Sequence, residues 1–151
     1  YNTARLKEIG GFRSKKNLFD DLVPTFTLVA KYGRADVAGI KAGFCRHSSN
    51  RGATVPIADW VEDGLYLLDV LCQVLPDGCP VLRAEGNLYF CKKMYSYIAR
   101  GSAVSRSPLD YLRIYKAFGY CYSPLRWFYV RKLSRRVDRI RQALARRNSV
   151  T

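Results

Sequence analysis

Two neighbouring stretches of the chain repeat their apolar residues at the spacing of an α-helix. The second stretch, residues 81–98, is separated from the first, residues 57–75, by Pro76, Asp77 and Gly78. Strand side chains alternate with a period of two, so a strand cannot place these apolar residues on one face. The pattern therefore predicts two helices joined by a short turn. It is clearest in the first stretch, at Ile57, Val61, Leu65, Leu68, Cys72 and Leu75.

The segment before this pair also favours helices. Apolar residues in 18–32 follow a helical stripe, with Pro24 in its first turn and Gly33 as its stop. The same segment is rich enough in β-branched and aromatic residues to fit a strand as well. A second helix is predicted to open at Asp36 and to end before the polar loop at 48–52.

The segment after the pair contains two helix-start signals. Ser107-Pro108 and Ser123-Pro124 each place an N-cap hydroxyl before a proline at the first helical position, and Asp110 adds a carboxylate in the first turn. The predicted fold class is all-α, with about six helices in an irregular bundle or a short helical-repeat array. The helices are expected to form three pairs, over 18–46, 57–100 and 108–147.

The net charge of +14 is concentrated at the two ends of this 151-residue chain. Residues 1–16 hold five basic residues and one acidic residue, whereas residues 17–123 hold twelve and ten. Residues 124–151 hold nine basic residues and one acidic residue. We therefore expect an extended basic N-terminal arm, a near-neutral helical body, and a long basic C-terminal helix packed on that body.

The C-terminal helix carries the main functional feature of the sequence. Aromatic residues 127–129 are expected to anchor it, and Leu133, Val137, Ile140 and Leu144 form its apolar edge. Asp138 is the only acid in the segment, so ion pairs within the helix cannot account for its basic residues. A guanidinium donates two parallel hydrogen bonds to a phosphate and stays charged. We predict that RNA binds to Arg126, Arg131, Lys132, Arg135, Arg136, Arg139, Arg141, Arg146 and Arg147.

An acidic protein surface or a membrane surface could also attract this helix. The sequence does not favour a helix that spans a bilayer, since the longest apolar candidate, residues 57–75, contains four carboxylates. We therefore predict no transmembrane segment.

Aromatic and basic residues alternate in two further places, over 89–97 and 111–116. Exposed rings there could stack on RNA bases. Aromatic residues at alternating positions of a helix are more often part of the core or of a protein interface. We favour the second interpretation.

The sequence offers no catalytic or metal-binding constellation. His47 is the only histidine, and Cys45 beside it has no further partner at metal-ligand spacing. The adjacent carboxylates Glu62 and Asp63 would point about 100° apart on a helix, so we expect a solvated face rather than an acid–base pair. The five cysteines form no C-x-x-C motif and favour a reducing compartment. We predict a non-catalytic protein with no cofactor, no metal and no small-molecule substrate.

The helix pairs, the arginine-rich C-terminal segment and the N-terminal Tyr1 together resemble lineage-specific mitochondrial ribosomal proteins. This resemblance implies a structural subunit in the mitochondrial matrix that contacts ribosomal RNA and neighbouring proteins. The plan of helix pairs is also similar to a pentatricopeptide-like accessory subunit of the ATP synthase catalytic head in euglenozoans. A chain that starts with Tyr fits removal of a presequence, release from a polyprotein, or trimming.

Overall fold

The computed structural model describes residues 3–33, 54–101, 103–105 and 107–148, with side chains up to Val137 and that of Arg139. Its elements are all helices, and no strand occurs in these ranges, where Pro56 and Val104 form a single isolated bridge. The predicted all-α class is confirmed. The helices are α1 (Thr3–Glu8), α2 (Leu22–Tyr32), α4 (Ile57–Val74), α5 (Cys79–Ala99), α6 (Asp110–Ala117) and α7 (Pro124–Asn148).

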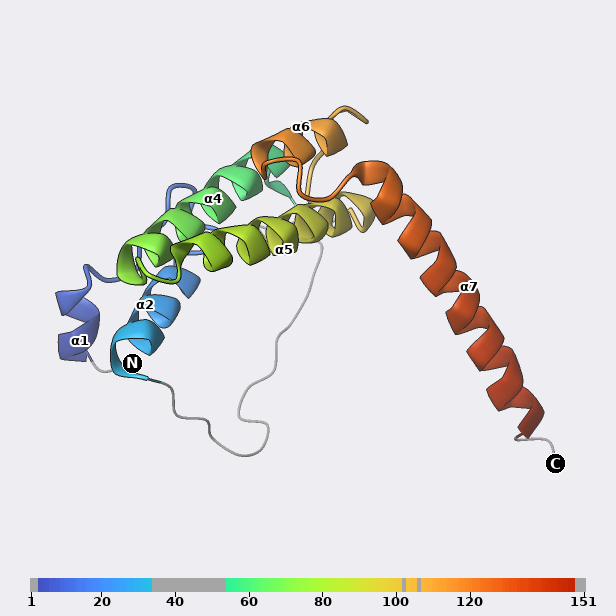
Figure 1. Ribbon diagram of the computed structural model, residues 1–151, viewed down its shortest axis with the longest axis horizontal. Helices are drawn as coiled ribbons and strands as arrows, with labels where there is room; N and C mark the ends of the chain where they lie inside the picture. Colours follow the sequence, from blue (N-terminus) through green and yellow to red (C-terminus); the bar gives the residue numbers. More distant parts are fainter. Residues whose placement is uncertain (1–2, 34–53, 102, 106, 149–151) are drawn as a thin grey trace.

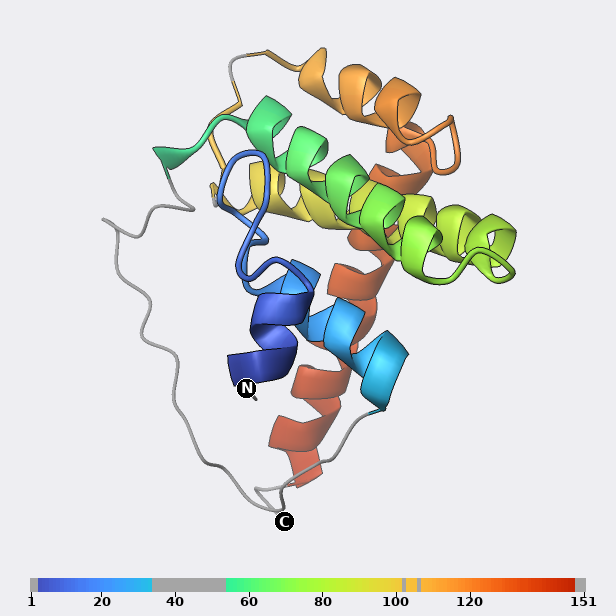
Figure 2. The same cartoon turned by 90° about the vertical axis from the view of Figure 1, so that its left-hand side faces the viewer.

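The two long central helices, α4 and α5, form an antiparallel hairpin against which α2, α6 and α7 pack, while α1 packs against α2 (Figure 1). Figure 2 shows α6 on one side of this hairpin and α1 with α2 on the other. Both helices of the predicted 57–100 pair are present with nearly the expected bounds. The three-pair plan as a whole stays a prediction, because the helix expected from Asp36 lies outside the described residues.

Two glycines bring α4 and α5 into close contact. A Cβ atom on Gly64 of α4 would lie 3.2 Å from the Phe90 ring of α5. A Cβ atom on Gly86 of α5 would lie only 2.3 Å from Cδ2 of Leu68. Leu68 and Phe90 are both buried, so each occupies the space that a side chain on the facing helix would need.

Aromatic side chains continue the core outward from this contact. The Phe90 ring lies 5.6 Å from that of Phe19, which precedes α2, and 6.1 Å from that of Phe118, which follows α6. The Trp60 ring of α4 meets Phe19 edge to face at 5.5 Å. Ring pairs at these separations add to the free energy gained by burial. They connect segments on both sides of the hairpin.

The carboxylate of Asp63 is fully buried, contrary to the solvated face expected for it. It accepts hydrogen bonds from the backbone N–H groups of Lys16 and Leu18, both at 2.8 Å. Its neighbour Glu62 does lie near the surface, where it forms ion pairs with Lys15 and Lys16. The sequence pattern around Glu62 and Asp63 could not show which carboxylate is buried, because the partners of Asp63 are backbone groups 45 and 47 residues away.

The first sixteen residues are not the extended arm that their charge suggested. Residues 3–8 form α1, and Ile9 is buried. Glu8 accepts a hydrogen bond from the Tyr32 hydroxyl at 2.6 Å, which lowers the pKa of the carboxyl and raises that of the phenol. The guanidinium of Arg5 lies 4.1 Å above the same ring. The N-terminal segment is therefore part of the folded body.

Several local predictions are confirmed. The segment 22–32 is a helix, with Pro24 in its first turn and Gly33 at its C-cap. Gly33 has a φ of 79°, a left-handed conformation that glycine adopts without steric cost, and its N–H bonds to the Val29 carbonyl. The start of α6 differs from the prediction, because the helix begins at Asp110 with Leu109 at its N-cap, two residues after the expected start at Pro108. The Ser107 hydroxyl accepts from the Leu109 N–H in the turn before the helix, and Asp110 accepts from the Ser107 N–H.

We expect Asp63→Ala to lower the free energy of unfolding by about 1–3 kcal/mol, because two backbone N–H groups lose their acceptor in a buried site. Glu62→Ala is the matched control, since it removes a carboxylate from exposed ion pairs and is expected to cost under about 1 kcal/mol. Urea denaturation followed by circular dichroism measures both. Equal losses for the two variants would contradict the role given to Asp63.

Gly86→Val is expected to destabilise the protein by about 2 kcal/mol or more, because the new side chain overlaps buried Leu68. Ala84→Val on the exposed side of the same helix is expected to cost about 0.5 kcal/mol, through helix propensity alone. Thermal denaturation of both variants provides the comparison. A Gly86→Val protein as stable as Ala84→Val would show that the two helices do not meet at this glycine.

Candidate nucleic-acid interface

The basic helix α7 begins where the serine–proline motif predicts. The Ser123 hydroxyl accepts a hydrogen bond from the Arg126 N–H at 3.2 Å, and Pro124 is the first helical residue. This N-cap satisfies one of the N–H groups that a helix start leaves without an intrahelical partner. It also sets the direction in which the chain leaves the body.

Trp127 holds the first turn of α7 against α5 and α6. The indole is buried and lies 5.7 Å from the Tyr95 ring of α5 and 6.1 Å from the Tyr111 ring of α6. The Tyr95 hydroxyl donates to the carbonyl of Tyr122, two residues before α7, at 3.0 Å. Burial raises the pKa of both phenols, so they stay protonated at neutral pH.

The three aromatic residues expected to anchor α7 behave differently. Trp127 is buried, as expected, and Phe128 is exposed on one side but contacts the Tyr111 ring at 5.0 Å. Tyr129 is exposed, so its expected anchoring role is wrong. The helical turn explains this, because three consecutive residues spread over about 200° and only part of that arc can face the body.

Three of the predicted RNA-binding arginines continue the row that Trp127 begins. Arg131, Arg135 and Arg139 follow Trp127 at steps of four, so all four residues share one face of α7. The guanidinium of Arg131 lies 4.9 Å above the Trp127 ring, and Nε of Arg139 donates to the Arg135 carbonyl at 3.3 Å. The contact with the indole orients Arg131, while Arg135 and Arg139 are exposed.

The other basic residues of α7 surround this row. Lys132 and Arg136 are exposed, whereas the side chains of Arg141, Arg146 and Arg147 lie outside the described ones. Where side chains are described, no carboxylate forms an ion pair with a basic residue of α7. The helix therefore presents cationic groups to solvent, as a phosphate-binding surface does.

Basic residues of the N-terminal segment are used differently. Lys15 and Lys16 pair with Glu62, and Lys16 also approaches Asp59. These pairs raise the pKa of Lys16 and partly neutralise it within the body. Of the two basic ends of the chain, α7 is therefore the one whose described basic side chains are better placed to bind an external anion.

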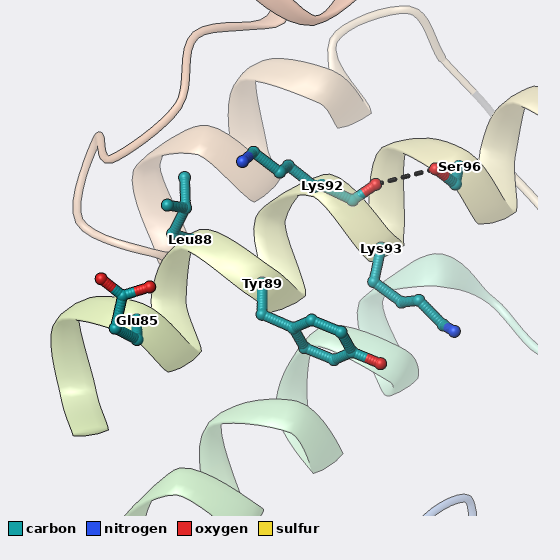
Figure 3. Close-up of a pocket in the computed structure, with 6 residues that line it drawn as sticks. All are labelled: Glu85, Leu88, Tyr89, Lys92, Lys93 and Ser96. Carbon is teal, nitrogen blue, oxygen red and sulfur yellow. Dashed lines mark hydrogen bonds between the residues drawn. The ribbon is translucent and has the colours of Figure 1, made fainter.

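The exposed face of α5 holds an open pocket of about 370 Å³ (Figure 3). Lys92 and Lys93 extend to opposite sides of it, and the Tyr89 ring lies between α5 and α4 with 56% of its surface exposed. Both Tyr89 and Tyr97 have the Lys93 ammonium group within 6 Å of their ring centres. The lining consists of Glu85, Leu88, Tyr89, Lys92, Lys93 and Ser96.

Tyr122 connects this α5 face to the start of α7. The Lys92 ammonium lies 4.7 Å and the Arg126 guanidinium 5.3 Å from the Tyr122 ring. Lys92 and Arg126 are far apart in the sequence, and Tyr122 belongs to no recognisable motif, so the sequence did not reveal this convergence. It extends the cationic surface of α7 onto the body.

The alternating aromatic residues of α5 are mainly structural, in agreement with the favoured interpretation. Phe90 and Tyr95 are buried in the core, and only Tyr89 is widely exposed.

Burial raises the pKa of the Cys91 thiol to about 11, so this group is not a thiolate at neutral pH.

The sequence also raised the questions of a metal site and of a membrane-spanning segment. Within the described ranges, no three His, Cys, Asp or Glu side chains come close enough to hold a metal ion. His47 and Cys45 lie outside those ranges. None of the described helices has an apolar stretch long enough to span a bilayer.

The described ranges define an all-α protein. No protein-family model matches the chain, and no curated protein or solved structure resembles it at a significant level.

We expect Trp127→Ala to release α7 from the body and to destabilise the protein by about 3 kcal/mol or more, since a buried indole is lost. Phe128→Ala removes a half-exposed ring from the same turn and is expected to cost less. Amide hydrogen exchange should show faster exchange over 124–137 in Trp127→Ala than in Phe128→Ala. Faster exchange in Phe128→Ala than in Trp127→Ala would show that Trp127 is not the residue that anchors α7.

Proposed function

We propose that this protein is a non-catalytic structural subunit of a large assembly and that it contacts RNA through α7. The basic residues predicted from the sequence bind phosphate groups along this helix. The proposal keeps the three-pair helical plan that ends in a long basic C-terminal helix.

The single observation that carries the proposal is the exposed arginine row of α7. Arg135 and Arg139 have no carboxylate partner among the described side chains, and Arg131 is held in place by the Trp127 ring. Neutralising several phosphates releases the counterions condensed on RNA, which supplies affinity without sequence specificity. A subunit that stabilises a folded RNA needs this kind of binding.

The α5 face fits the same role. Lys92 and Arg126 approach Tyr122 from two helices, so a backbone that follows α7 reaches cationic groups on the body as well. Exposed Tyr89 offers a ring on which an unpaired base can stack.

The assembly we propose is a mitochondrial ribosome, with ribosomal RNA and neighbouring ribosomal proteins as partners. A chain of this charge and of mainly helical structure suits an accessory subunit in the matrix. The alternative is a protein-binding accessory subunit of another mitochondrial complex, such as the catalytic head of the ATP synthase. There the arginine row would meet acidic protein instead of phosphate.

Binding of the purified protein to a structured RNA across a salt series tests the proposal. The logarithm of the affinity is expected to fall steeply and linearly with the logarithm of the salt concentration. Replacing Arg135, Arg136 and Arg139 by Gln should weaken binding and make the slope shallower by about one unit per residue.

The matched control replaces Lys15, Lys31 and Arg83 by Gln. This variant loses the same three charges, but from residues that form ion pairs with carboxylates of the body. Its RNA affinity should fall less than that of the α7 variant. Equal losses would show that net charge alone drives binding, and weak binding with a flat slope would favour the ATP-synthase type of subunit.

A further inference from the structure

A row of four apolar side chains on α7 has no partner in the described part of the protein. Leu125, Tyr129, Leu133 and Val137 follow one another at steps of four, so they form one ridge along the helix. They are 82%, 66%, 42% and 45% exposed. The ridge is about 18 Å long, at 1.5 Å per residue.

This ridge faces away from the body. It is displaced by two residues from the row of Trp127, Arg131, Arg135 and Arg139, and two residues correspond to a rotation of about 200°. The apolar row and the arginine row therefore lie on nearly opposite faces. Leu133 and Val137 were expected to form the apolar edge, but the described part of the body leaves both exposed.

Basic residues flank the ridge on both sides. Lys132 and Arg136 lie along one side, and Arg126 lies in the first turn on the other. A partner that covers the ridge must therefore combine an apolar groove with carboxylates at its rim. A second copy of this chain lacks that complementarity, since its net charge is +14. Phe128 and Val130, which are 46% and 44% exposed, add apolar surface beside the start of the ridge, while Lys132 and Arg136 border its later part.

We infer that α7 docks through Leu125, Tyr129, Leu133 and Val137 into an acid-rimmed apolar groove of a neighbouring protein. The helix enters the groove with residues four apart as its anchors, and the flanking cations meet the rim. This inference goes beyond the proposed RNA contact, whose central row of Arg131, Arg135 and Arg139 lies on the opposite face. The two contacts together make α7 a bridge between an RNA and a protein.

Calcium-loaded calmodulin is a suitable probe, because it offers an apolar groove among acidic residues and closes that groove when calcium is removed. The full-length protein should bind it with calcium and not after chelation. Leu133→Gln combined with Val137→Gln should weaken this binding by about tenfold or more, because two aliphatic anchors are lost without any change of charge.

Ser134→Gln is the matched control, since it changes an exposed residue beside the ridge and leaves the charge unchanged. It should bind calmodulin within about twofold of the wild type. The ridge variant should keep its affinity for structured RNA, which separates this test from the test of the proposed function.

Three outcomes would overturn the inference. The first is calmodulin binding that is unchanged in the ridge variant. The second is ridge-dependent binding to vesicles of phosphatidylserine and phosphatidylcholine without binding to calmodulin, which would assign the ridge to a membrane. The third is a dimer in sedimentation experiments that the ridge variant abolishes, which would make a second copy the occupant.

Discussion

The close approach of α4 and α5 is the contact on which the other packing depends. Gly64 lets the Phe90 ring lie against α4, and Gly86 leaves room for Leu68 against α5. From Phe90 the core extends to Phe19 before α2 and to Phe118 after α6. Each helix buries only one face, so segments that are far apart in sequence must pack against a shared central element. In this protein that element is the α4–α5 hairpin. The hairpin thus acts as the frame for both ends of the chain.

Local features of the fold could be predicted because they depend on neighbouring residues. The stop at Gly33 and the start at Ser123 follow from backbone geometry within one turn. The buried position of Asp63 could not be predicted, because its partners are backbone groups 45 and 47 residues earlier in the sequence. For the same reason charge alone misassigned residues 3–8, whose helix depends on contacts with α2.

In the candidate site, too, the local features could be predicted from the sequence and the long-range contacts could not. Spacing by four places Arg131, Arg135 and Arg139 on one face, and the sequence alone was enough to propose them as phosphate ligands. Which way that face points depends on Trp127, and hydrophobicity alone suggested the reverse arrangement, with Leu133 and Val137 toward the body. A single buried indole outweighs these aliphatic side chains because it packs against two rings on two other helices.

The pairing of Lys15 and Lys16 with carboxylates of α4 has a consequence for how the molecule meets its partners. Positive charge is partly cancelled where the N-terminal segment folds back, and it is left uncompensated along the described part of α7. Residues 124–151 hold nine basic residues against one acidic residue, so the positive charge of the chain is concentrated toward α7. If the partner is a polyanion, as proposed, its long-range attraction would act most strongly on this helix and would favour encounters in which α7 meets the target first.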